Sequence, residues 1–197
     1  FDYIEPSENN EECYSYRIHA MLMRTCIEVE ANCKAILIEN GYNRPRNKLT
    51  MNDYRKINIS HRLDQYRVRL PYWHGANSIR EPFVGWRSSS SLPWYSAYNA
   101  SKHDRHNSFS RATLGTLVEA VCGLVALLSS QFHREDYGPG YDVLAISGPS
   151  DGFDSAIGNY FDVEFPSNWP VDERYDFSSD DWRKLECLPD PFQNLPW

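Results

Sequence analysis

The sequence predicts a mainly α-helical protein, a helical bundle with a small, irregular, β-containing extension at its C-terminal end. Two long segments, residues 9–40 and 108–132, carry apolar side chains at spacings of three and four, the period of a helix buried on one face. After residue 134 the composition changes to Gly, Pro, Asp and aromatic residues, which are typical of short strands and turns. The chain of 197 residues is long enough for one domain with a substantial core.

The first long helix is predicted over residues 9–40. Asn9 or Asn10 is expected to cap its start, and Gly41 is expected to end it, because glycine readily adopts the left-handed conformation that follows many helices. The side chains that the helical period places on its buried side are Ile18, Leu22, Cys26, Val29, Cys33 and Leu37.

A basic insertion, residues 41–92, separates this helix from the next strong helical pattern. Its segments are predicted in order as a basic loop at 43–50, the start of a helix at 51–65 capped by Asn52 or Asp53, a strand at 66–73, and a loop with extended pieces at 80–93.

Residues 93–106 are predicted to form a shorter helix with Pro93 in its first turn, where the missing N–H group costs nothing. The expected packed side holds Trp94, Ala97, Tyr98 and Ser101.

The second long helix is predicted over 108–132, with Ser108 or Ser110 as its cap. Glu119 and two glycines interrupt its apolar run, so we expect a helix buried in the bundle and no membrane span. These elements divide the chain into a helical core at 1–133, which carries the basic insertion, and an acidic, strand- and turn-rich extension at 134–197. A capped short helix is predicted inside that extension, over 178–186.

The charges are distributed unevenly along the chain. The net charge is −7, yet residues 41–111 hold thirteen Lys and Arg against four Asp and Glu, a net of +9, and residues 134–197 hold four against fourteen, a net of −10. Two interpretations stay open: the basic part binds a polyanion, or the two oppositely charged parts dock on each other. Eleven aromatic residues lie among the thirteen cations, a mixture suited to single-stranded RNA because bases stack on rings while phosphates pair with cations.

Polar side chains gather on one face of the predicted helix at 93–106. Asn99, Lys102, His103 and His106 follow one another at i, i+3, i+4 and i+7. An imidazole that exchanges a proton near neutral pH, next to cations that neutralise charge on phosphorus, is what metal-independent phosphodiester cleavage requires. The alternative is that this face is only the polar side of a packed helix.

Other kinds of site have weaker support in the sequence. His103 and His106 have a spacing that zinc can use, but no second ligand cluster accompanies them. The segment 147–152 contains glycines without the lysine of a phosphate-binding loop, and no serine-hydrolase motif is present. The five cysteines have no disulfide-framework spacing, so we expect reduced thiols in a cytoplasmic protein. Because the metal and phosphate-binding patterns are incomplete, we also expect no bound metal and no cofactor.

The run "WYSAYNASKHDR", followed by a Phe and a long Ala/Leu helix, resembles the W-x-x-Y-N-x-x-K-H-x-R segment of some HEPN-like (higher eukaryotes and prokaryotes nucleotide-binding) domains. The resemblance covers roughly residues 10–40 and 93–132. It implies a helical bundle that commonly forms a homodimer. Many members are metal-independent endoribonucleases of toxin–antitoxin, phage-defence or RNA-processing systems, and others are non-catalytic binding modules.

Under this resemblance His103 is expected to act as the general acid and base, Lys102 and Arg105 as a phosphate clamp, and Asn99 as a positioning donor. Active family members carry an Arg separated from the His by four to six residues; here Tyr98, Ala97 and Ser96 occupy those positions, and Tyr98 stands where the Arg is expected. The sequence therefore leaves two functions open: a metal-independent endoribonuclease, or a non-catalytic module that binds RNA, a nucleotide or a protein partner such as an antitoxin.

Overall fold

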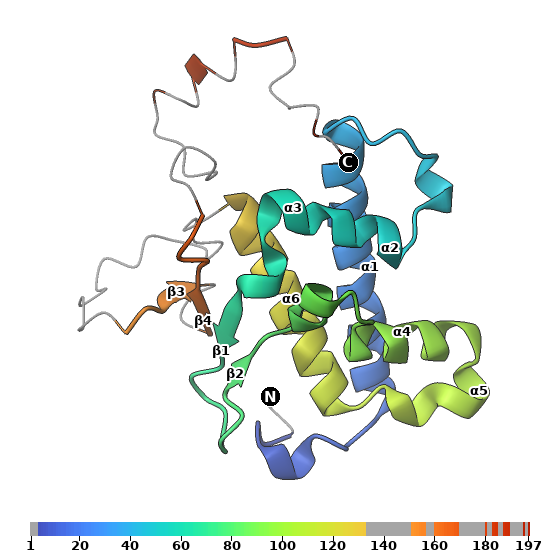
Figure 1. Ribbon diagram of the computed structural model, residues 1–197. Coiled ribbons are helices and arrows are strands. Elements are labelled where there is room, and N and C mark those ends of the chain that lie inside the picture. Colours follow the sequence, from blue (N-terminus) through green and yellow to red (C-terminus); the bar gives the residue numbers. More distant parts are fainter. Residues whose placement is uncertain are drawn as a thin grey trace.

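The computed structural model describes residues 4–132, 151–156 and 160–169, together with residues 180, 183–184, 187–189, 195 and 197. The described chain is mainly helical, and one four-stranded antiparallel sheet lies at the side of the helices (Figure 1). The predicted fold class is therefore confirmed at this level. The principal helices are α1 (Tyr16–Glu39), α4 (Pro93–His103) and α6 (Leu114–Phe132).

Helix α1 begins later than the sequence predicts. The segment before it holds only a short 3-10 helix, Glu8–Asn10, and the cap of α1 is Ser15, whose Oγ accepts a hydrogen bond from the N–H of Ile18. The predicted caps Asn9 and Asn10 are therefore wrong, because the chain turns before the main helix starts. All six side chains predicted for the buried side of this helix are buried, and Gly41 follows its end with a φ of 80°.

The basic insertion folds mainly into single helical turns. These are η2 (Arg46–Lys48), α2 (Met51–Tyr54), η3 (Arg55–Ile57), α3 (Asn58–His61), η4 (Leu63–Gln65) and η5 (Val84–Ser88). Thr50 caps α2, with Asp53 at its third position completing a capping box. Neither Asn52 nor Asp53 is the cap as predicted: the Asp53 side chain instead accepts a hydrogen bond back from the Thr50 N–H.

Helix α6 also starts later than predicted. Ser108 ends the short helix α5 (Arg105–Ser108), and a 3-10 turn, η6 (Phe109–Arg111), follows it. The cap is supplied by Thr113, whose Oγ1 accepts from the N–H of Thr116 while the Thr116 hydroxyl oxygen accepts from the Thr113 N–H. Neither Ser108 nor Ser110 caps this helix, since both belong to the turns before it.

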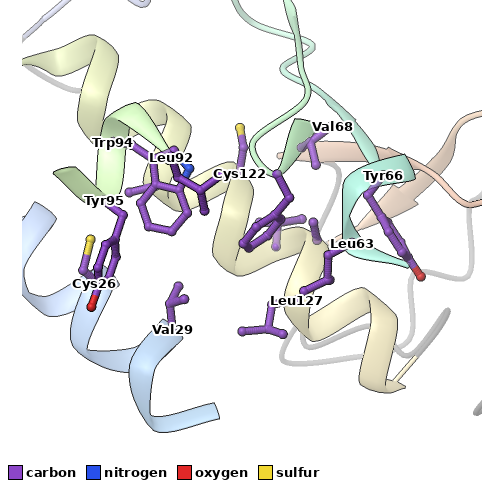
Figure 2. Close-up of a cluster of buried hydrophobic side chains, with 14 of the residues drawn as sticks. Cys26, Val29, Leu63, Tyr66, Val68, Leu92, Trp94, Tyr95, Cys122 and Leu127 are labelled. Atoms are coloured by element: carbon purple, nitrogen blue, oxygen red, sulfur yellow. The ribbon is translucent and has the colours of Figure 1, made fainter. Parts of the chain in front are cut away.

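The core lies between α1, α4, α6 and the segment leading into the sheet. Figure 2 shows side chains from each of these converging, among them Cys26, Trp94, Leu127 and Tyr66. Gly123 of α6 allows this helix to pack closely against Trp94 of α4, because a Cβ at that position would lie 3.2 Å from the Trp94 ring. The Trp94 indole N–H donates to the carbonyl of Pro82 at 2.8 Å, so the polar group of this buried side chain is satisfied.

The sheet joins distant parts of the chain. Its strands are β1 (Arg67–Arg69), β2 (Ile79–Arg80), β3 (Asp154–Ala156) and β4 (Phe161–Glu164), in the order β2-β1-β4-β3. Val68 of β1 faces Val163 of β4, and both are buried in the common core. The strand predicted over 66–73 is therefore present, with a shorter extent, and short strands occur after residue 134 as predicted.

The proposed division of the chain at residue 133 remains a prediction, because residues 133–150 lie outside the described part. Most of the segment 178–186, where a short helix is predicted, also lies outside it. Residues 161–169 contribute Val163 and Trp169 to the same core as the helices.

Candidate nucleic-acid interface

Helix α4 presents the packed side that the sequence predicts. Pro93 is in the first turn, and Trp94, Ala97, Tyr98 and Ser101 are buried. The Ser101 hydroxyl is within hydrogen-bond distance of two carbonyls, that of Ala97 at 2.9 Å and that of Ser108 at 3.1 Å. Ser101 therefore fixes the end of α4 against the end of the next helical turn.

The polar face predicted on this helix is not continuous. Helix α4 ends at His103, because Asp104 leaves the helical conformation at φ −138° and ψ 68°. Its carboxylate accepts a hydrogen bond from the N–H of Asn107 and so caps α5. The predicted single face is wrong in this respect: His106 lies on a different helix from Asn99, and the i+7 relation between them is lost.

Lys102 is held by a polar cluster between α1 and α4. Its Nζ lies 2.9 Å from the hydroxyl of Tyr98 and 3.7 Å from Oε1 of Glu30. Glu30 also accepts a hydrogen bond from the Tyr95 hydroxyl at 2.9 Å and pairs with Lys34 at 3.1 Å. The charge of Lys102 is thus already matched by a carboxylate of the same chain.

The cluster changes the acidity of its members. Burial raises the pKa of Tyr98, and the nearby Glu30 carboxylate raises it further. Burial acts to raise the pKa of Glu30 too, but hydrogen bonds from Tyr95 and Lys34 outweigh it, and the pKa is lowered. Glu30 is therefore ionised and the phenols are neutral near pH 7, an arrangement that positions α4 on α1.

The other predicted site residues lie at the surface. His103 and Arg105 are exposed and Asn99 is half-buried. Within the described part of the chain, no hydrogen bond or ion pair joins Asn99, Lys102, His103 and Arg105 to one another. The structure places these residues close along the chain without assembling them into a hydrogen-bonded catalytic group.

Arg105 instead contacts aromatic rings at the start of α1. Its guanidinium carbon lies 5.7 Å from the ring centre of Tyr16 and 5.9 Å from that of Phe109. Phe109 also packs on Tyr16 at 5.0 Å and, edge-on, on Tyr14 at 5.9 Å. His19 completes the group, because its ring centre lies 5.2 Å from that of Phe109.

We refer to this group and its two neighbouring imidazoles as the corner surface: Tyr14, Tyr16, His19, His103, Arg105, His106 and Phe109. Burial lowers the pKa of His19, and the charge of Arg105 lowers it further. His19 is therefore neutral near pH 7. Its Nε2 is buried without a hydrogen-bond partner among the described residues.

The sequence prediction missed Tyr16, His19 and Phe109. The available signal was the run "YSYRIH", in which Tyr16 and His19 stand three positions apart on one side of a helix. The contribution of Phe109 depends on the break at Asp104, which turns the chain back towards α1.

The basic insertion has a different environment. Arg67 pairs with Glu164, and Arg69 pairs with both Asp151 and Asp162, the latter at 2.8 Å. The charges of β1 are thus matched by the acidic strand beside it. For Arg67 and Arg69, the structure therefore supports the second interpretation of the charge pattern, in which oppositely charged parts of the chain dock on each other.

Two further arginines of the insertion are also paired. Arg80 is 9% exposed and bridges Glu11 at 2.6 Å and Glu119 at 3.2 Å. Arg44 bonds Asp53 at 2.7 Å. The carboxylates of the protein itself therefore match much of the positive charge that the sequence locates in this stretch.

No group of three or more His, Cys, Asp or Glu residues in the described ranges could hold a metal ion. Helix α6 alone among the described helices is long and apolar enough to cross a membrane, and 61% of its most apolar window is buried in the protein. The core helix of a bundle has the same composition.

Comparison of the chain with protein-family models, curated proteins and solved structures finds no match.

Proposed function

We propose that this protein binds RNA at the corner surface as a non-catalytic, HEPN-like helical module. The observation that carries the proposal is the contact of Arg105 with two aromatic rings, Tyr16 and Phe109, in place of a carboxylate. A cation that has no acidic partner retains its attraction for phosphate, and neighbouring rings offer surfaces for bases.

The surrounding charges support this location. Within the described residues, no ion pair involves His103, Arg105, His106 or the nearby Arg111. The only carboxylate in the α4–α5 turn, that of Asp104, accepts hydrogen bonds from Asn107. Arg105, the one Lys or Arg of the corner surface, therefore lies against rings without an ion pair in the described part of the chain, whereas the arginines of the sheet are matched by acids.

The test is binding of a fluorescein-labelled, unstructured RNA to the full chain, followed by anisotropy over a series of salt concentrations. We expect Arg105→Ala to weaken binding and to reduce the slope of log affinity against log salt by about 1, the value for one lost phosphate contact.

Arg87→Ala is the matched control. It removes the same charge at an exposed arginine that pairs with Glu81 at 3.2 Å. Equal losses from both substitutions would indicate a general charge effect and remove the support for the corner surface. No binding by the unaltered chain at low salt would overturn the proposal.

The second candidate function is a metal-independent endoribonuclease. It rests on the exposed imidazole of His103 beside Arg105, and on the resemblance to HEPN-like domains. Its difficulty is chemical: Lys102 is occupied by Glu30, and the neutral phenol of Tyr98 cannot neutralise phosphate charge as a guanidinium does.

Incubation of the protein with mixed RNA in EDTA decides between the two. RNA cleavage that His103→Ala abolishes, with RNA binding retained, would replace the binding proposal by the catalytic one. A homodimer and an antitoxin-like protein partner remain proposals that follow from the resemblance, and a cytoplasmic location remains a proposal that follows from the spacing of the cysteines. Light scattering of the purified chain tests the first of them.

A further inference from the structure

The two tyrosines at the start of α1 are unusually exposed for large aromatic side chains. Tyr14 is 54% exposed and Tyr16 is 74% exposed. Neither hydroxyl makes a hydrogen bond within the described part of the chain. Both rings pack on Phe109.

The backbone fixes the position of both rings. Tyr14 forms a bridge with Thr113, and the N–H of Leu114 donates to the carbonyl of Cys13 at 2.7 Å. Ser15, between the two tyrosines, caps α1. The rings are therefore held on ordered backbone before any ligand arrives, which lowers the entropic cost of binding.

The positive charge of Arg105 lies against this group of rings. Arg105 lies over both Tyr16 and Phe109, so its guanidinium is held beside the exposed rings. A ligand that places a flat ring on Tyr16 would thus bring an attached negative group close to Arg105. An unpaired nucleotide has this combination of a flat base and a phosphate.

We infer that Tyr16, supported by Phe109, is a stacking platform for an unpaired base, with Arg105 receiving an adjacent phosphate. The ligand class is single-stranded RNA, and duplex RNA is excluded because its bases are stacked on one another and unavailable to a protein ring. The inference rests on the proposed function and names which form of RNA that surface accepts.

The test compares three ligands of equal length on the full chain: an unstructured RNA, the same RNA paired with its complement, and an abasic strand with the same phosphates. We expect the unstructured RNA to bind most tightly. Tyr16→Ala should weaken its binding about 5- to 150-fold, the range for one lost stacking contact, and should leave the weak abasic binding unchanged.

Tyr16→Phe is the matched control, because it retains the ring and removes only the hydroxyl. It should bind like the unaltered chain. A 2-aminopurine base in the RNA gives a direct readout: its fluorescence should fall on stacking with the unaltered chain and with Tyr16→Phe, and should fall less with Tyr16→Ala. Circular dichroism checks that each variant is folded.

The outcomes separate the two proposals. RNA binding that is unchanged by Tyr16→Ala, or equal binding of duplex and unpaired RNA, overturns the platform and leaves the corner surface as a phosphate-binding site. Absence of RNA binding by the unaltered chain overturns the proposed function and the platform with it.

Discussion

The sheet and the corner surface both carry arginine, but the arginines of the two regions have opposite environments. In the sheet, Arg69 lies between the carboxylates of Asp151 and Asp162. At the corner, Arg105 lies over rings, with no carboxylate partner in the described part of the chain. The two regions are on opposite sides of α1 and α6, with the sheet at the left and α5 at the right of Figure 1.

The difference shows that a count of charges along the sequence does not locate a binding surface. A cation paired inside the protein contributes to the fold, whereas an unpaired one stays available to a ligand. The net of +9 over residues 41–111 therefore combines arginines of two kinds. We expect substitution of the paired arginines to lower stability, and substitution of Arg105 to weaken RNA binding.

The largest effect is expected at Arg80, the most buried of the paired arginines. Arg80→Met should lower the free energy of unfolding by about 3–5 kcal/mol, because it leaves Glu119 without its cation in a partly buried position. Urea unfolding followed by tryptophan fluorescence measures the change. A loss of stability as small as that of an exposed ion pair would show that water already solvates Glu119. The contrast between the paired arginines and the corner surface would then weaken.

Acidification should separate the buried histidine from the exposed ones. Burial lowers the pKa of His61 from 6.5 to about 4. The unfolded chain therefore binds the proton first, so stability is complete above pH 6.5 and falls as the pH approaches 4, by about 3 kcal/mol in total from this group.

Comparing variants separates the contribution of His61 to the pH dependence of stability from that of the carboxylates. Unfolding measured at several pH values should depend less steeply on pH in His61→Gln than in the unaltered chain. His103→Gln is the control, because it makes the same substitution at an exposed histidine. Equal slopes for all three proteins would contradict the assignment.

A smaller effect on stability is expected in the sheet. Arg69→Met should cost about 1 kcal/mol, since its side chain is 29% exposed and solvent screens both ion pairs. RNA affinity should remain unchanged, because the arginine is already neutralised. A marked loss of affinity would show that the acidic strand does not mask β1 from a polyanion.

The smallest effect on stability is expected at the corner. Arg105→Met should change the free energy of unfolding by less than about 0.5 kcal/mol, the usual range for an exposed position. It should nevertheless weaken RNA binding, in contrast to Arg69→Met. The two variants carry the same substitution, so a reversed order of their effects would break the comparison between the regions.

The sequence predicted the helical core well, because helix periodicity reports burial directly. The predicted buried side of α1 and the packed side of α4 were both correct. The helix starts were less accurate: Ser15, Thr50 and Thr113 supply the start of their helices in place of the neighbouring residues that were predicted. Several residues near each start have suitable side chains, and tertiary contacts select among them.

The candidate site was less predictable for a physical reason. Asn99, Lys102, His103 and Arg105 are close in sequence, but Asp104 caps a new helix and redirects the chain. Glu30, the acidic partner of Lys102, and Tyr16, one of the two rings against Arg105, come from α1, about 70 to 90 positions earlier, and no local pattern reports such contacts. Likewise, nothing in the local sequence indicates which arginines the acidic segment neutralises.

The pairing of β1 with β4 has a consequence for how the chain folds. The ion pair between Arg67 and Glu164 spans 97 positions, so the loop that brings these strands together closes slowly compared with the formation of local helices. The individual helices, which depend on local contacts, are therefore expected to form before the sheet. Until β4 arrives, Val68 and the hydrogen-bonding edge of β1 stay uncovered, and self-association competes with correct folding during that interval.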